Sequence, residues 1–270
     1  MDDDFMVTAF VVLDKTMAAL GHWDDVRAQA SDAAVLTVAV VAARYCQNHL
    51  ARALQVMHLG RYRSGPLSVS RFNRRLHHLA GWLGLAVATL GALFAAGEVF
   101  LIDSMPVPVC RRARARRCRK VRGQAFCGYC AAKREQFFGW RLPLICTADG
   151  VPVACDLLPG GLHDLTPVHE LTYGLPERAT VYGDKGDNGA ADEATILAET
   201  GVRLVPLRKA NMAPNAWTDK LALRAYRKRI EALYSQLAAM GVPRLRARTN
   251  PGLALKLHAA LLAATIANAN

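Results

Sequence analysis

The chain has 270 residues, long enough to bury one large hydrophobic core or two smaller ones. It carries 34 Lys and Arg residues against 22 Asp and Glu residues, and this net charge of +12 favours a polyanionic partner, with nucleic acid ahead of a membrane surface. The seven cysteines are an odd number, and the chain opens Met-Asp-Asp-Asp rather than with a secretory signal. We therefore expect a reduced cytoplasmic protein rather than a disulfide framework.

Residues 1–97 are predicted to form an all-helical N-terminal domain. Apolar residues recur at helical spacing over 7–20, 32–57 and 70–96. Turn signals at Gly60 and at Ser64-Gly65-Pro66 separate the last two stretches. A helix-turn-helix-like element is expected here.

The segment 70–83 is the best candidate for a DNA-reading helix. Ser70 is expected to cap it, and Phe72, Leu76 and Leu79 then share one apolar face. A second face presents the polar and basic side chains of Arg71, Asn73, Arg74, Arg75 and His78. A helix docked by an apolar face and basic on its other face suits base reading in a DNA groove. A surface helix with a solvated basic face is the competing interpretation.

The uncharged stretch 79–97 approaches the roughly 20 residues that a membrane span requires. It is rich in Gly and Ala, lacks an aromatic belt and runs directly into a predicted strand. We therefore expect a buried helix and no membrane association.

From Glu98 onwards the pattern changes to alternating strands and helices, which predicts an α/β domain over 98–270. Strands are predicted at 98–105, 137–147, 151–158, 179–183 and 202–207, and helices at 163–173, 189–200, 218–240 and 252–267. This order is typical of a ribonuclease-H-like nuclease, with a mixed five-stranded sheet flanked by helices.

Three acidic residues occupy positions that favour a metal site. Asp103 lies in the middle of the apolar strand 98–105, where an uncompensated carboxylate costs several kcal/mol. Asp184 closes the strand 179–183 after Gly183, and Glu231 lies on the helix 218–240. Together they offer the hard oxygen ligands that Mg²⁺ prefers. The competing interpretation makes the aspartates turn residues and pairs Glu231 with Arg227, four residues earlier.

Residues 111–122 contain eight basic residues in twelve and are predicted to connect the first two catalytic strands. Such a run neutralises phosphates without reading bases, although it also fits a solvated loop. The candidate DNA contacts in and around the catalytic domain are Arg111, Arg112, Arg114, Arg116, Arg117, Lys133, Lys185 and Arg227. The two lysines fit ordinary surface positions equally well.

Four cysteines raise the question of a zinc site. Cys127 and Cys130 form a CxxC pair, but Cys110 and Cys118 are spaced far more widely than the ligands of a zinc knuckle. We expect free thiols.

Several segments, taken in order, resemble bacterial insertion-sequence transposases of the DDE type, and the chain is most similar to the insertion-sequence family 982. They are Ser70-Arg-Phe-Asn-Arg-Arg-Leu, Ile102-Asp-Ser-Met-Pro-Val-Pro-Val-Cys, Gly128-Tyr-Cys-Ala-Ala-Lys, Phe138-Gly-Trp-Arg-Leu, Leu158-Pro-Gly-Gly-Leu-His-Asp, Val181-Tyr-Gly-Asp-Lys, Arg208-Lys-Ala-Asn and Arg227-Lys-Arg-Ile-Glu. The resemblance covers nearly the whole chain.

The resemblance implies an enzyme that cleaves phosphodiester bonds at transposon ends and joins the freed 3′-hydroxyl ends to target DNA. It implies two divalent ions, Mg²⁺ or in its place Mn²⁺, with Asp103 bridging both and Asp184 and Glu231 each holding one. The implied partners are double-stranded DNA, as terminal inverted repeats and as target, and at least a second copy of the chain on that DNA. A bacterial, nucleoid-associated location follows.

Two departures from the family pattern support a second interpretation. Gly186-Asp187 stands where the family has a small residue and then Tyr, which adds a carboxylate near the metal site. Cys127 and Cys130 replace basic or polar positions. A transposon-derived DNA-binding protein that no longer cleaves is therefore the alternative function.

Overall fold

The structure is a computed structural model that describes residues 2–60, 67–130, 134–163 and 165–269. Lys133 and the predicted turn at Ser64-Gly65-Pro66 lie outside these ranges. The chain divides into two compact units. The N-terminal unit comprises residues 1–90 and 236–270, and the sheet unit comprises residues 91–235.

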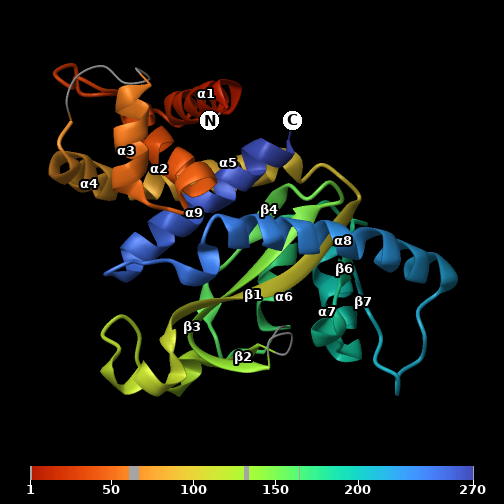
Figure 1. The fold of residues 1–270 in the computed structure, drawn as a ribbon. Coiled ribbons are helices and arrows are strands. Elements are labelled where there is room, and N and C mark those ends of the chain that lie inside the picture. Colours follow the sequence, from red (N-terminus) through yellow and green to blue (C-terminus); the bar gives the residue numbers. More distant parts are fainter. Residues whose placement is uncertain (1, 61–66, 131–133, 164, 270) are drawn as a thin grey trace. The chain divides into compact units, whose positions relative to one another are not determined.

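The N-terminal unit is helical, as the apolar spacing predicts. Its helices are α1 (Asp3–Ala19), α2 (Asp32–Cys46), α3 (Leu50–Leu59), α4 (Val69–His78), most of α5 (Ala80–Phe94) and, from the C-terminal end of the chain, α9 (Asn250–Asn268), with the short η4 (Val242–Arg244) (Figure 1). α2 and α9 form its centre, and most of their residues are buried.

The single helical stretch expected at 32–57 is divided into α2 and α3. Gln47 and Asn48 adopt left-handed backbone conformations, with φ of 49° and 62°, and this ends α2. Asparagine tolerates that conformation better than most residues. The side-chain amide of Asn48 also donates to the carbonyl oxygen of Met240 at 2.9 Å, so the break is held by a buried hydrogen bond.

The predicted DNA-reading helix is α4, but its ends differ from those expected at 70 and 83. Ser68, not Ser70, is the N-cap, because its Oγ accepts from the backbone N–H of Arg71 at 3.3 Å. The helix ends at His78, and the chain bends by 52° into α5. Phe72 and Leu76 are fully buried, which confirms the apolar face.

The apolar stretch 79–97, expected as a buried helix, forms α5, which is buried on one face only. Leu83 and Ala86 are fully buried, whereas Leu85 and Leu93 are 50% and 68% exposed. Among the described residues, no single helix has the length and apolar composition needed to cross a membrane. The bent pair of α4 and α5 meets those two criteria only when both helices are counted together.

The sheet unit contains a mixed sheet of seven described strands rather than the five predicted. They are β1 (Val99–Arg111), β2 (Cys127–Cys130), β3 (Glu135–Thr147), β4 (Pro152–Cys155), β5 (Leu158–Pro159), β6 (Thr180–Gly183) and β7 (Arg203–Pro206). The order is β2-β3-β1-β6-β7, with β4 and β5 also paired to β3. The prediction missed β2 and β5, which carry none of the β-branched residues typical of strands. The order and flanking helices are compatible with a ribonuclease-H-like domain.

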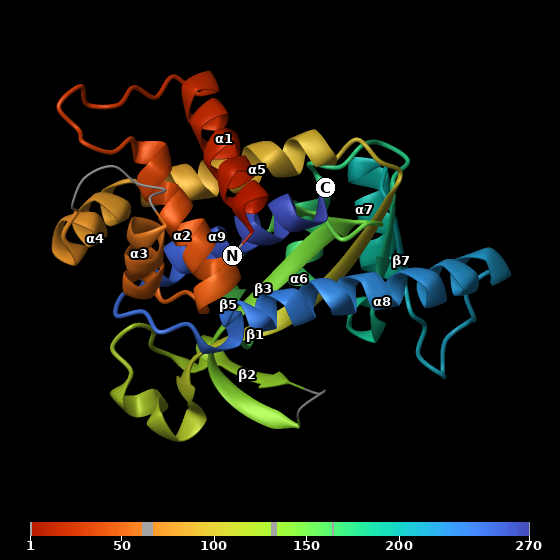
Figure 2. The same ribbon diagram turned by 45° about the horizontal axis from the view of Figure 1, so that its top comes forward.

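Alternation along the strands separates the two faces of the sheet. Phe100 and Ile102 belong to a buried cluster with residues of α6 (Thr166–Thr172) and α7 (Ala190–Thr200). Successive strand residues point to opposite faces, so Leu101 and Asp103 face the other side. That side is covered by α8 (Trp217–Ala239), as both ribbon views show (Figure 2). Asp103 therefore lies between the sheet and α8.

Candidate active site

The pairing of β1 with β6 brings two of the predicted acids together. These strands are parallel, and Leu101 is level with Tyr182. Asp103 follows Leu101 by two residues, and Asp184 follows Tyr182 by two residues. Both acids therefore lie on the same face of the sheet. β6 ends at Gly183 while β1 continues to Arg111, so the two carboxylates lie where the paired region of these strands ends.

The turn after β6 depends on a close approach between Gly183 and Asp187. The Oδ2 atom of Asp187 accepts from the backbone N–H of Asp184 at 2.9 Å, in a capping box that opens the short helix η3 (Lys185–Asp187). A side chain at Gly183 would place its Cβ 2.6 Å from that same oxygen. Asp187 is only 5% exposed. Asp187 thus shapes the turn that presents Asp184.

α8 is anchored to the sheet near its beginning. The carboxylate of Asp219 accepts two hydrogen bonds from the guanidinium of Arg203 on β7, at 3.0 and 3.1 Å. The hydroxyl of Tyr182 on β6 lies 3.4 Å from the same carboxylate. The ring of Tyr182 also stacks against that of Tyr226, with centroids 5.9 Å apart.

A second anchor lies one turn beyond Glu231. The hydroxyl of Tyr234 donates to the backbone carbonyl of Asp103 at 2.6 Å. Burial raises the pKa of this hydroxyl well above its ordinary value, and the charge of Asp103 adds to the effect. The bond fixes the segment of α8 that carries Glu231 against the strand that carries Asp103.

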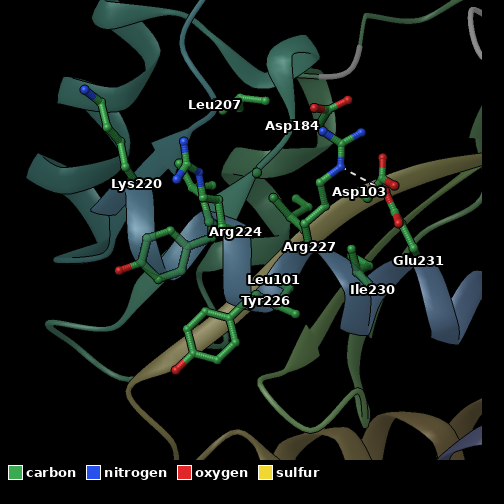
Figure 3. A pocket seen from close by; sticks show the side chains of 14 residues that line it. Leu101, Asp103, Asp184, Leu207, Lys220, Arg224, Tyr226, Arg227, Ile230 and Glu231 are labelled. Carbon is green, nitrogen blue, oxygen red and sulfur yellow. Dashed lines mark hydrogen bonds and ion pairs between the residues drawn. The ribbon is translucent and has the colours of Figure 1, made fainter. Parts of the chain in front are cut away.

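All three predicted acids line one cavity of about 330 Å³. Asp103 is half-buried, while Asp184 and Glu231 are exposed. The basic residues of the lining all come from one face of α8: Lys220, Arg224 and Arg227. Figure 3 shows the guanidinium of Arg227 among the three carboxylates. Its Nε donates to Oε1 of Glu231 at 2.9 Å, so the i,i+4 pair that the sequence offered as an alternative is present within the acidic site.

All three acids raise the pKa of Arg227. Its pKa is raised first by the hydrogen bond to Glu231, then by the charge of Asp184, and also by that of Asp103. The arrangement therefore places one fixed positive charge within a group of three carboxylates.

The oxygens of the three acids do not gather as tightly as the ligands of a single ion. In the part of the chain that the structure describes, the one set of three potential ligands within 4.8 Å of one another is His22, Asp24 and Asp32, in the N-terminal unit. Among the described residues no three cysteines lie within that distance of one another, and the expectation of free thiols stays a prediction.

The predicted DNA-contacting residues occupy several separate surfaces. On α4, Arg71 and Arg74 are exposed, while Asn73 and Arg75 are half-buried. Arg75 Nε pairs with Oδ1 of Asp32 at 2.6 Å, so this arginine also has a structural role. In the sheet unit, Lys185 is exposed on η3.

The basic run begins at the end of β1 and continues in the short helix η1 (Arg112–Arg117). Its five candidate arginines, which are Arg111, Arg112, Arg114, Arg116 and Arg117, are exposed. β1 is thus longer than the predicted 98–105, and part of the expected connection is ordered as a turn of helix.

Sequence reasoning missed Tyr234, Arg224 and Lys220. The two basic residues had a usable signal, because they precede Arg227 by three and seven residues and so share its face of the helix. Tyr234 had a weaker sequence signal, since it lies one helical turn after Glu231. Its partner is a backbone carbonyl 131 positions away, which leaves no trace in the sequence pattern.

Fold and site together define a mixed α/β domain with three carboxylates at one cavity. A family model described as "Transposase DDE domain" matches residues 95–245. This range is more than half of the chain and contains all three acids. The chain belongs to this family, and the membership supports a function in DNA transposition. No curated protein and no solved structure matches the chain.

Proposed function

We propose that this protein is a DDE transposase that cleaves DNA at the ends of its own element and joins those ends to target DNA. The observation that carries the proposal is the convergence of Asp103, Asp184 and Glu231 on one cavity inside the matched domain. The finer resemblance to the insertion-sequence family 982 agrees with it.

The chemistry of the donor set fits divalent metal ions. Carboxylate oxygens from two strands and a helix, open on one side to solvent, suit Mg²⁺ or Mn²⁺, which retain coordination positions for water and phosphate oxygens. Asp103 would bridge two ions, with Asp184 on one and Glu231 on the other. Bound there, such ions activate the attacking oxygen and stabilise the leaving one.

The remaining residues of the cavity have roles that follow from their charge and position. Lys220 and Arg224 line the same cavity and add positive charge to it, which suits contact with a phosphodiester backbone. Tyr234 and Asp187 act by positioning, because their hydrogen bonds go to the backbone of Asp103 and Asp184.

DNA binding is proposed to involve both units. In the N-terminal unit, α4 would read the terminal repeat. In the sheet unit, the basic run and Lys185 would contact phosphates of any duplex. Lys133 belongs to the same proposal. Cutting two ends in a coordinated way requires at least two copies of the chain on the DNA, in the bacterial nucleoid.

The test is cleavage of a labelled duplex from the end of the element, with and without Mg²⁺. Asp103→Ala, Asp184→Ala and Glu231→Ala should each abolish cleavage while leaving duplex binding largely intact. Asp187→Ala should have a milder effect. Asp149→Ala is the matched control, since Asp149 is exposed in the same unit and outside the cavity. Near-normal cleavage by Glu231→Ala would show that the third ligand is wrongly assigned.

A further inference from the structure

We infer that Arg227 is an internal counter-ion of the carboxylate site, whose guanidinium occupies in the metal-free protein a place that a divalent cation takes when it binds. The inference rests on the proposed function and adds a competition to it: the arginine and the metal exclude one another. Metal binding would therefore require Arg227 to release Glu231 and turn away.

The geometry places the guanidinium where a cation is needed. Arg227 donates to Oε1 of Glu231 at 2.9 Å, and Figure 3 shows its planar group directed towards Asp184 and Asp103 rather than along the helix surface. Three carboxylates around one cavity repel one another unless a positive charge offsets them. Arg227 supplies that charge from α8, the helix that also carries Glu231.

The strength of the interaction suits a contact that opens. The side chains of Arg227 and Glu231 are 58% and 57% exposed, so water screens their attraction. Exposed pairs of this kind contribute little to stability. A divalent ion that binds several carboxylates at once has the larger attraction and displaces the arginine, whereas a buried bidentate pair would resist it.

Neighbouring basic residues of the cavity do not share this position. Arg224 precedes Arg227 by three residues on the same helix and lines the same cavity. Among the described residues, the ion pair within this group of acids joins Arg227 to Glu231 and does not involve Arg224. Arg224 therefore gives a control of equal charge, on the same helix, without the proposed competition.

The experiment measures Mn²⁺ binding to the full-length protein in the absence of DNA, by the loss of the free-ion signal in electron paramagnetic resonance. Arg227→Gln should bind Mn²⁺ about two- to fivefold more tightly than wild type, because the competing cation is gone. Arg224→Gln should change the affinity by clearly less. Thermal unfolding of each variant checks that the fold is retained.

Each outcome decides the matter. Unchanged or weaker binding by Arg227→Gln overturns the inference, and so does an equal gain in both variants, since that would reflect net charge alone. Asp103→Ala distinguishes a failure of the metal site from a failure of the competition. If it removes Mn²⁺ binding while Arg227→Gln has no effect, the metal site stands and only the competition fails. If neither wild type nor Arg227→Gln binds Mn²⁺ in a way that depends on Asp103, the proposed function fails together with the inference.

Discussion

Tyr234 shows how a single hydroxyl group sets the geometry of the candidate site. It lies on the same helix as Glu231 and bonds to the backbone of Asp103, so it joins the elements that carry two of the three acids. A backbone acceptor is unaffected by substitutions of the Asp103 side chain. The spacing between strand and helix is therefore fixed independently of the carboxylate itself.

Tyr234→Phe should weaken Mn²⁺ binding and slow end cleavage while the fold persists. The change leaves the carbonyl of Asp103 without this donor, which costs about 1–2 kcal/mol of stability. Metal titration and thermal unfolding measure the two effects separately. Tyr226→Phe is the control, since its ring stacks on Tyr182 in the same helix region without a recorded bond to Asp103.

A positioning role predicts that excess metal restores much of the lost cleavage in Tyr234→Phe. Loss of stability alone, with metal affinity unchanged, would contradict that role.

At the scale of single residues, the sequence was sufficient to propose the three acids but not the contacts that hold them. Asp103 stood out because a carboxylate within an apolar strand is costly without compensation, and Asp184 because it closes a strand after a glycine. Tyr234 and Asp187 did not stand out, because their hydrogen bonds to backbone atoms depend on how strands, turn and helix pack.

Elements of secondary structure were predicted more reliably in kind than in extent. Periodicity identified most of the helices and five of the seven described strands. It did not show that β1 continues to Arg111, because Pro106 and Pro108 argue against a central strand. The recorded pairing with β6 is confined to Val99–Leu101, so these prolines follow the part of β1 that is paired on both sides. Likewise, the end of α2 depends on left-handed backbone at Gln47 and Asn48.

The two basic elements should differ in how they bind DNA. The double variant Arg74→Gln/Arg75→Gln should weaken binding to a terminal-repeat duplex much more than binding to a random duplex, because a capped helix can hold side chains against base edges. Replacing several arginines of the basic run should weaken both alike and reduce the salt dependence by about one unit of slope per lost phosphate contact.

Binding of both variants to both duplexes, measured across a salt series, tests this difference. Arg75 also pairs with Asp32, so Arg74→Gln alone is the cleaner measure of base reading. An equal loss of affinity for the two duplexes would show that α4 binds DNA by general electrostatic attraction and does not read bases.

On the scale of the whole molecule, the two compact units do not result from a single division of the chain, because one of them contains both chain ends. The sequence predicted domains of 1–97 and 98–270, whereas the compact units join 236–270 with the first 90 residues. Periodicity along the chain reports which face of a helix is apolar, but not which distant segment covers it. α9 is helical by its pattern, and its place among the N-terminal helices follows only from packing.

The stability of the N-terminal unit should decrease as the solution becomes mildly acidic. Burial lowers the pKa of His258 on α9 below its ordinary value of 6.5, so the folded state binds this proton less readily than the unfolded state. The unfolded chain therefore gains protons first as the pH falls, and folding loses free energy below about pH 6.5.

Thermal or denaturant unfolding at several pH values between about 8 and 5 measures this loss. In His258→Gln the decline over that range should be smaller than in wild type. Because every other titrating group is common to both proteins, the difference between the two curves isolates His258. Parallel curves would contradict the assignment.

The two-residue repeat of the strands has a consequence for the inheritance of this gene. Asp103 and Asp184 share a face because each lies two residues beyond a paired position. An in-frame insertion of one codon between Leu101 and Asp103 would turn the carboxylate towards the apolar face covered by α6 and α7. An insertion of two codons would keep its side of the sheet. Copies of the gene that remain active should therefore tolerate changes of length in the loops but not a single added codon at this place.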